Sequence, residues 1–273
     1  MIRNVLSIAG SDPSGGAGIQ ADLKAFAARG VYGMAALTAL TAQNTRGVSG
    51  VHLVPAAFVA DQIRSVLSDI RVDAVKIGMI ANAEIAGAVA DVLRRHRDIP
   101  VVLDPVMVAK GGANLLDPDA VDVLTRRLLP LASVLTPNLP EAAALLHADV
   151  AQSRKAMAEQ SGALRSLGPA AVLVKGGHLA GDESPDVLAT SDGLHWFEAI
   201  RVPTVNTHGT GCTLSSALAA ELAKGDELHH AVAASKAYLA EAVAKADTLN
   251  VGSGHGPVQH FHQLWQTQEG HQS

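Results

Sequence analysis

A glycine-rich segment near residue 210 carries the residue types best suited to chemistry in this chain. It reads Asn206-Thr207-His208-Gly209-Thr210-Gly211-Cys212-Thr213, and a stretch predicted to be helical follows it as far as Lys224. Glycines let consecutive backbone N–H groups point toward one site, and the first turn of a helix adds unpaired N–H groups and a partial positive charge. The segment therefore predicts an anion hole suited to a phosphoryl group during its transfer.

The thiol of Cys212 lies at the start of that predicted helix. A helix N-terminus lowers the pKa of a thiol, so this position predicts a reactive group. The alternative is a small buried core residue, which is a common fate of a free cysteine. The glycine-rich surroundings favour the functional interpretation. Cys212 is also the only cysteine of the chain, which rules out a disulfide framework and a cysteine-rich zinc site.

Five further segments, rich in glycine or polar residues, follow predicted strands. Any one of them alone would be interpreted as a turn. In a parallel α/β sheet, however, the carboxyl ends of the strands meet at one edge, and ligands bind there. We therefore expect one pocket to be surrounded by residues 10–18, 41–45, 78–79, 104–107 with their continuation to 112, and 175–178.

Short apolar runs alternate with helical stretches along the chain, and these elements must position the segments above. The runs are apolar throughout, as in strands whose two faces are both covered by helices. This order predicts an α/β fold, a three-layer α/β/α sandwich with a mostly parallel central sheet. The expected strands are 5–9, 35–43, 72–77, 101–103, 134–135 and 171–174, with a hairpin of 186–189 and 194–200; the expected helices are 17–29, 55–69, 82–95, 118–129, 140–146, 153–167, 213–224 and 227–246. We expect a single domain over residues 1–273, with a short tail rich in glycine and histidine from about residue 252.

The amino-acid composition argues against several classes of protein. Of 273 residues, 48% are hydrophobic and 17% are charged, with a formal net charge of −5. Proteins dedicated to nucleic acids carry a basic footprint, so this acidic balance argues against one. A signal peptide or a membrane span would need a longer apolar stretch than the chain offers. We therefore expect no nucleic-acid partner, no membrane partner, and a cytoplasmic location in which the thiol stays reduced.

Three familiar site motifs are weakened or excluded. Residues 16–21 match the first part of the dinucleotide fingerprint, but its acidic partner is missing because no Asp or Glu occurs between Asp22 and Asp61. None of the eight lysines is followed by Ser or Thr, so there is no P-loop. The 12 histidines form no His-Glu-x-x-His motif, so we expect no zinc site. A nucleotide triphosphate would therefore need another anion cradle.

Several of these segments, taken in order, resemble a known family. They look like the hydroxymethylpyrimidine/phosphomethylpyrimidine kinases, the thiamin-pathway branch of the ribokinase superfamily. The resemblance rests on residues 5–20, 43–45, 102–106, 136–141 and 206–212, and it extends from about Arg3 to His262. The Gly-Thr-Gly-Cys run is specific to this branch, because a sugar kinase would carry Asp where Cys212 stands.

The resemblance implies a ribokinase-like fold and an ATP-dependent phosphotransferase. Its substrates would be 4-amino-5-hydroxymethyl-2-methylpyrimidine and the monophosphate of that compound, which becomes the diphosphate. The implied cofactors are ATP and Mg²⁺, and the requirement for a monovalent cation stays open. We expect a homodimer.

At the phosphoryl end, the resemblance makes Gly209, Thr210 and Gly211 the anion hole. Cys212 would face the hydroxymethyl group of the substrate, at the position that the family assigns to the base. A thiolate is a weak base for an alcohol, but a loose transition state needs little early deprotonation. Lys175 would meet the phosphates of ATP; its alternative is a solvated lysine at a strand end.

The other nucleotide and metal residues also follow from the resemblance. Asn138-x-x-Glu141 resembles the magnesium motif of the superfamily, and the same two residues could equally cap a helix. Asp104, at a strand end, would organise the metal with Glu141. Thr207 and Lys236 join Lys175 and Asn138 as ATP-binding residues, although a solvated helix face also explains Lys236.

For the pyrimidine ring, the resemblance points to Gln43, Asp22, Met79, Val106 and Gly10. A planar aminopyrimidine needs a donor and an acceptor, and the Gln43 amide supplies both. Met79 and Val106 would contact the faces of the ring, or would be core residues. Asp22 would accept a hydrogen bond from the exocyclic amine.

Three other functions stay open. A pyridoxal kinase of the same branch would phosphorylate a similar hydroxymethylated ring, although Gln43 and Met79 favour the pyrimidine. A dehydrogenase would use the 16–18 loop and bind NAD(P)H. A sensor would bind pyrimidine phosphate without turning over ATP. We also expect Gly111-Gly112, the stretch 181–185, or both, to close over the site.

Overall fold

The computed structural model describes residues 1–107 and 118–265, and within them nine strands form one sheet in the order β3-β2-β1-β4-β5-β6-β7-β8-β9. From β2 to β7 in this order, neighbouring strands are parallel. At one edge β3 is antiparallel to β2, and at the other β8 is antiparallel to β7 and β9 is antiparallel to β8. The strands are β1 Asn4–Ser11, β2 Tyr32–Asn44, β3 Gly47–Leu53, β4 Ala74–Ile77, β5 Val101–Leu103, β6 Val134–Leu135, β7 Ala171–Lys175, β8 Asp186–Thr190 and β9 Gly193–Phe197. The prediction of a mostly parallel sheet is confirmed.

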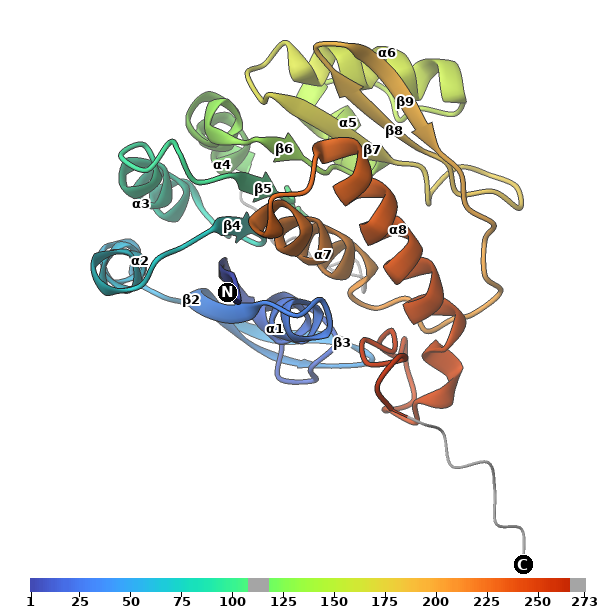
Figure 1. The fold of residues 1–273 in the computed structure, drawn as a ribbon, viewed down its shortest axis with the longest axis horizontal. Coiled ribbons are helices and arrows are strands. Elements are labelled where there is room, and N and C mark those ends of the chain that lie inside the picture. The colour runs from blue at the N-terminus through green and yellow to red at the C-terminus, as the bar shows by residue number, and fades with distance from the viewer. Residues whose placement is uncertain (108–117, 266–273) are drawn as a thin grey trace, which may run out of the picture.

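Helices cover both faces of this sheet (Figure 1). One face carries α1 Gly18–Ala28, α7 Thr210–Lys224 and α8 Leu228–Ala244. The other carries α2 Ala56–Asp69, α3 Ala83–Leu93, α4 Pro118–Val123, α5 Leu139–Leu146 and α6 Arg154–Arg165. The three layers predicted from the sequence are therefore present.

The alternation of side chains along each strand builds one core on each side of the sheet. On β1, Val5 packs toward α1 and α7, whereas Leu6 and Ile8 pack toward α2 and α3. This is the period of two that a strand imposes on its side chains. Because both faces are buried, the strands show no polar alternation in the sequence.

Two elements differ from the sequence prediction. The strand β3 was not predicted, because Gly47 and Gly50 and the polar residues Ser49 and His52 weaken its strand signal. It pairs with β2 through backbone hydrogen bonds that any residue type can make. The helix expected over 118–129 ends at Val123 and continues as a wider π-helical turn over Leu124–Leu128 and a 3₁₀ turn over Leu129–Leu131. Pro130 lacks the N–H that a regular helix would need there.

The glycine- and histidine-rich stretch after residue 252 packs against the body of the protein as far as the structure describes it. Val258, Gln259 and His260 are buried, and Tyr238 donates a hydrogen bond to the carbonyl of His260 at 2.9 Å. His260 Nε2 lies 3.0 Å from Thr213 Oγ1, whose hydrogen goes to the Gly209 carbonyl at 2.8 Å. His260 must therefore be the donor, and the stretch braces the start of α7 rather than forming a loose tail.

Acid should loosen this bracing. Burial, assisted by the charge of Lys24, lowers the pKa of His260 to about 4. In the unfolded chain His260 gains a proton near pH 6.5, whereas in the folded protein it stays neutral down to about pH 4. The stability that neutral His260 contributes is therefore complete above pH 6.5 and is lost as the pH falls toward 4. At pH 5 the loss is about 2 kcal/mol. We expect thermal unfolding of the wild type to shift more between pH 7 and pH 5 than that of His260→Gln; equal shifts would contradict this account.

Among the described residues, no helix is both long enough and apolar enough to cross a membrane.

Candidate active site

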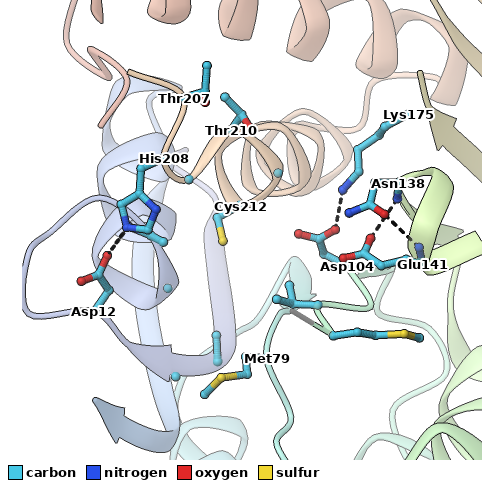
Figure 2. Close-up of a pocket in the computed structure, with 18 of the residues that line it drawn as sticks. Asp12, Met79, Asp104, Asn138, Glu141, Lys175, Thr207, His208, Thr210 and Cys212 are labelled. Atoms are coloured by element: carbon cyan, nitrogen blue, oxygen red, sulfur yellow. Dashed lines mark hydrogen bonds and ion pairs between the residues drawn. The ribbon is translucent and has the colours of Figure 1, made fainter. Parts of the chain in front are cut away.

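A cavity of about 550 Å³ opens at the carboxyl edge of the parallel strands. Loops that follow β1, β2, β4, β5, β6 and β7 line it together with residues 207–212 (Figure 2). Most of the predicted site residues meet here: Gly10, Gln43, Met79, Asp104, Val106, Asn138, Glu141, Lys175, Thr207, Gly209, Thr210, Gly211 and Cys212. Asp22 and Lys236 do not line the cavity.

The predicted anion hole begins at Gly209, where the backbone turns into α7. Gly209 has φ +78°, and a Cβ atom there would overlap the carbonyl oxygen of Gly16. Glycine is required at this position, because the two glycine-rich loops press their backbones together. Thr213 N–H closes the first turn of α7 on the Gly209 carbonyl at 2.8 Å, and Thr210 N–H donates to the Thr207 carbonyl at 3.4 Å. The N–H groups of Gly211 and Cys212 therefore remain as the free donors of the first turn. They face the cavity end that residues 209–212 line.

A buried ion pair stands beside that helix start. Lys175 Nζ lies 2.8 Å from Asp104 Oδ1, and Asp104 is 1% exposed. Thr136 and Ser215 place hydroxyl groups 3.2 and 3.3 Å from the Asp104 oxygens. Burial alone would raise the pKa of Asp104, but the charges of Lys175 and Lys76 hold it below its ordinary value. The alternative of a solvated lysine at a strand end is therefore wrong for Lys175, because the ion pair with Asp104 fixes its charge at the wall of the cavity.

Asn138 and Glu141 cap α5 reciprocally. Glu141 Oε2 accepts a hydrogen bond from the Asn138 N–H at 2.8 Å, and Asn138 Oδ1 accepts one from the Glu141 N–H at 2.9 Å. The capping interpretation is thus confirmed, while both residues also line the cavity. Burial, with the nearby charge of Asp104, raises the pKa of Glu141 to about 7 despite Lys175. A carboxyl held in this way is one that a cation would stabilise in its charged form.

The expectation of a lowered thiol pKa is wrong. Burial, together with Asp22 and Asp104, raises the pKa of Cys212 to about 11, although Lys76 and the Gly18 N–H act in the opposite direction. The helix start and one lysine do not offset the desolvation of a thiolate next to two carboxylates. Cys212 is therefore a neutral thiol at neutral pH.

The lone thiol makes this testable by alkylation, since every adduct forms on Cys212. Below pH 9 we expect iodoacetamide to label the folded protein at least about tenfold more slowly than a free thiol of ordinary pKa. The rate should rise with an inflection well above pH 9. Protein unfolded in urea should react with the ordinary profile. An inflection near or below pH 8.5 in the folded protein would contradict a raised pKa.

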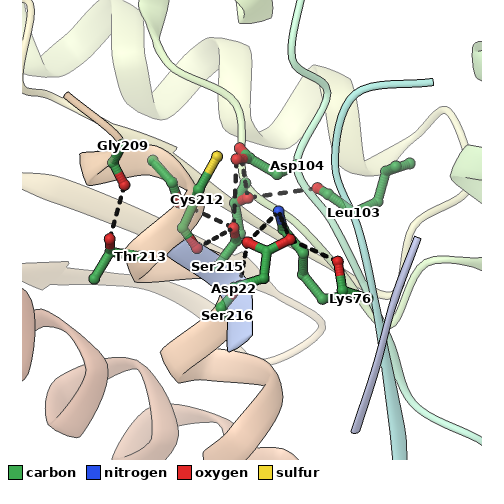
Figure 3. A network of polar contacts seen from close by, with 12 residues as sticks. Asp22, Lys76, Leu103, Asp104, Gly209, Cys212, Thr213, Ser215 and Ser216 are labelled. Atoms are coloured by element: carbon green, nitrogen blue, oxygen red, sulfur yellow. Dashed lines mark hydrogen bonds and ion pairs between the residues drawn. The ribbon is translucent and has the colours of Figure 1, made fainter. Parts of the chain in front are cut away.

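The structure places Asp22 below the cavity rather than in it. Asp22 is fully buried, and its two oxygens contact Lys76 Nζ at 2.8 and 3.0 Å, Ser7 Oγ at 2.6 Å and Ser216 Oγ at 2.7 Å (Figure 3). A carboxylate with four donors has no room for a substrate amine. The prediction of a direct contact is corrected to a structural one: Asp22 neutralises Lys76, which does line the cavity floor.

Lys236, like Asp22, has a structural role, and it holds another loop in place. Its ammonium group contacts the Ser184 carbonyl at 2.8 Å and Asp186 Oδ2 at 2.5 Å. Arg201 donates to the carbonyls of Gly177, Leu179, Gly181 and Glu183. The stretch 181–185, expected to close over the site, is thus tied down on two sides. The other expected lid, Gly111-Gly112, lies outside the described residues.

Sequence reasoning missed the polar cluster at the opposite end of the cavity. His208 Nε2 lies 2.7 Å from Asp12 Oδ2, and Gln43 Nε2 lies 3.4 Å from the same nitrogen. Asp12 also caps its loop by accepting from Ser14 and Ala17. Figure 2 shows Cys212 between this cluster and the Lys175–Asp104 pair. The chain separation of 196 residues left no local signal for the Asp12–His208 contact.

The chain was compared with known proteins. A family model described as phosphomethylpyrimidine kinase matches residues 12–259. A hydroxymethylpyrimidine/phosphomethylpyrimidine kinase of Escherichia coli K12 is 55% identical over 96% of this chain and 98% of its own length. One from Rhizobium meliloti is 55% identical over 97% and 99%.

Solved structures show the same fold. A phosphomethylpyrimidine kinase of Clostridium difficile has a TM-score of 0.78 at 42% identity, covering 88% of this chain and 99% of its own. A Bacillus subtilis pyridoxal kinase in an ADP complex has a TM-score of 0.87 at 35% identity, covering 95% and 98%. A Staphylococcus aureus pyridoxal kinase in complex with AMP-PCP has a TM-score of 0.88 at 34% identity, covering 97% and 95%.

Proposed function

This chain belongs to the phosphomethylpyrimidine kinase family, and on that premise we propose how its cavity performs the reaction. The protein is a hydroxymethylpyrimidine/phosphomethylpyrimidine kinase of thiamin biosynthesis, an ATP-dependent phosphotransferase. One observation carries the assignment of the site. A single cavity joins the start of α7 and Lys175 at one end to Gln43 and Met79 at the other. Such a cavity can hold a phosphoryl donor and a small polar ring together.

At the phosphoryl end, we assign the transferring group to the first turn of α7. The N–H groups of Gly211 and Cys212 would stabilise negative charge on the phosphoryl oxygens, while Thr210 N–H donates to the Thr207 carbonyl at 3.4 Å. Lys175 would neutralise phosphate charge from the side, which is the main contribution a protein makes to a loose phosphoryl transfer. Thr207 and Asn138 line the same end and would contact the nucleotide.

The donor set near Lys175 fits Mg²⁺. Among the described residues, no three His, Cys, Asp or Glu side chains gather as a metal cage. Mg²⁺ does not need one, because it is commonly held by one or two carboxylates, water and substrate phosphates. Asp104 and Glu141 supply that pair of carboxylates. When bound, the ion would neutralise phosphate charge, and it would stabilise the ionised form of Glu141.

At the acceptor end, we place the hydroxymethyl oxygen near Cys212. The thiol is neutral at pH 7 and so contributes position rather than an ionised base. In a loose transition state the alcohol loses its proton late, so a strong base is not needed for the transfer. Gln43 would pair with the edge of the ring, and Met79 and Val106 would contact its faces. Gly10 leaves room for Met79, because a Cβ there would overlap the Met79 methyl group.

The test is release of ADP, followed by a coupled assay. Turnover is expected with the hydroxymethylpyrimidine and then with its monophosphate. No turnover with either compound would overturn the assignment and would favour the sensor. The dehydrogenase hypothesis is set aside, because the 16–18 loop packs against Gly209 and His208 in this kinase site.

A second substrate deserves the same assay, because two of the similar structures are pyridoxal kinases. We propose pyridoxal as the poorer substrate. A higher kcat/KM for pyridoxal than for the pyrimidine would reverse this order.

Domain, location and assembly are further proposals. We propose one catalytic domain over residues 1–273, supported by the continuous sheet, and a cytoplasmic location. We also propose a homodimer, supported by exposed apolar side chains on β2, β3 and α2, namely Leu40, Val51, Leu53 and Phe58. Light scattering after size-exclusion chromatography would show a mass of one chain if the dimer is wrong.

A further inference from the structure

A chain of hydrogen bonds runs along the ring-binding end of the cavity. Thr41 Oγ1 lies 2.8 Å from the Ser11 carbonyl. As placed, Gln43 Oε1 lies 3.1 Å from Thr41 Oγ1 and Gln43 Nε2 lies 3.4 Å from His208 Nε2. A half-turn of the amide exchanges these two atoms without moving any other group, so the hydrogen-bond partners decide its orientation. His208 Nε2 lies 2.7 Å from Asp12 Oδ2. His208 and Asp12 are buried, at 7% and 2% exposure.

Counting hydrogens from the Thr41 end fixes one side of the amide. Thr41 has a single hydroxyl hydrogen, and the Ser11 carbonyl can only accept it. Thr41 Oγ1 must then accept from Gln43. The amide atom facing Thr41 is therefore the nitrogen, which carries the hydrogens.

The contacts at the Asp12 end favour the same orientation of the Gln43 amide. Burial would raise the pKa of Asp12, but hydrogen bonds from His208 and Ser14 lower it, so the group is a carboxylate that accepts. His208 Nε2 must carry the hydrogen that points to it. Because that hydrogen is donated to Asp12, Nε2 has no lone pair left to accept from an amide nitrogen, and the Gln43 atom facing it at 3.4 Å is the oxygen. The Thr41 hydroxyl thus sets the orientation of Gln43 by a hydrogen bond, and the His208 N–H supports it by disfavouring the reversed amide.

We propose that Thr41, His208 and Asp12 are positioning residues that lock the Gln43 amide with its oxygen toward His208 and its nitrogen toward Thr41, and that this polarity selects a 4-aminopyrimidine and sets its orientation. The proposal rests on the function proposed above. The free edge of the locked amide offers one acceptor on the His208 side and one donor on the Thr41 side. An exocyclic amine next to a ring nitrogen matches this edge at both points.

The locked polarity also directs the reactive group. The carbon that bears the amine is adjacent to the carbon that bears the hydroxymethyl group. Pairing the amine with the oxygen on the His208 side therefore turns the hydroxymethyl group toward His208. Residues 209–212 follow His208 and line the cavity, and Figure 2 shows Cys212 between His208 and the Lys175–Asp104 pair. A reversed amide would turn the ring over and point the hydroxymethyl group to the Thr41 side instead.

The test uses two substrates of opposite polarity. The 4-oxo analogue of the hydroxymethylpyrimidine carries an acceptor in place of the amine and an N–H in place of the ring acceptor. We expect the wild type to prefer the amine strongly in kcat/KM. In Thr41→Val the amide is free to rotate, so the preference should fall at least about tenfold, because the rejected analogue can now be paired. Thr41→Ser keeps the hydroxyl and should retain the preference within about threefold.

Each outcome separates the possibilities. A purely structural role for Thr41 would lower kcat/KM for both compounds equally and leave the preference unchanged, which would overturn the proposal. A Thr41→Ser variant that loses the preference would do the same. If Thr41→Val turns over too slowly, calorimetric binding of the two compounds gives the same ratio. A wild type that turns over neither compound refutes the proposed function instead.

Discussion

Replacing Lys175 with methionine should lower kcat by about 10³-fold or more in the ADP-release assay, because it removes the fixed positive charge beside the start of α7. Methionine keeps much of the length and apolar stem of the side chain, so the loss reports the charge. Lys175 lies at the cavity wall, 2.8 Å from Asp104. A variant that keeps a tenth of the wild-type kcat would show that phosphate charge is neutralised elsewhere.

The stability of this variant needs a control. Asp104 is buried, and removal of its partner leaves an uncompensated carboxylate, which costs about 3–5 kcal/mol in comparable pairs. The double variant Lys175→Met, Asp104→Asn removes both charges and should recover thermal stability. It should not recover activity. Recovery of both would mean that the single variant failed by unfolding rather than by losing the charge at the site.

Replacing Gly209 with alanine should lower kcat by about 10²-fold or more, because the anion hole can no longer close on the first glycine loop. The new Cβ would overlap the Gly16 carbonyl, so the turn into α7 must shift. The N–H groups of the first turn shift with it, away from the transferring phosphoryl group. The loss should appear in kcat for both phosphorylation steps.

Gly225 provides the matched control at the other end of the same helix. Its φ is +95°, close to the +78° of Gly209, but a Cβ there meets nothing within 4 Å. Both alanine variants carry backbone strain of about 1–3 kcal/mol. Gly225→Ala should therefore lose stability and keep its kcat. Equal losses of kcat in the two variants would assign the effect of Gly209 to strain in α7 and not to the shape of the anion hole.

The sequence predicted the three α/β/α layers because strand patterns and helix caps depend on residues close together in the chain. Apolar runs predicted strands covered on both faces. The helix expected from residue 82 does begin there, where the Asn82 side chain accepts from the Ile85 N–H at 2.9 Å. Asn138 and Glu141 cap α5 at the expected spacing of three residues. The strand β3 was missed because backbone pairing at a sheet edge leaves little mark on the side chains.

The sequence by itself determined the three layers, the alternation of strands and helices apart from β3, and most of the segments that meet at the carboxyl edge, because period and cap residues act within a few positions of the chain. Only the tertiary structure decided the charges within the cavity. Whether Cys212 ionises depends on burial and on Asp22, Asp104 and Lys76, which come from three other elements. For the same reason, Asp22 pairs with Lys76 rather than with the substrate, and Asp12 pairs with His208. Charge and hydrogen-bond partners act through space, and folding brings together residues that the sequence keeps far apart.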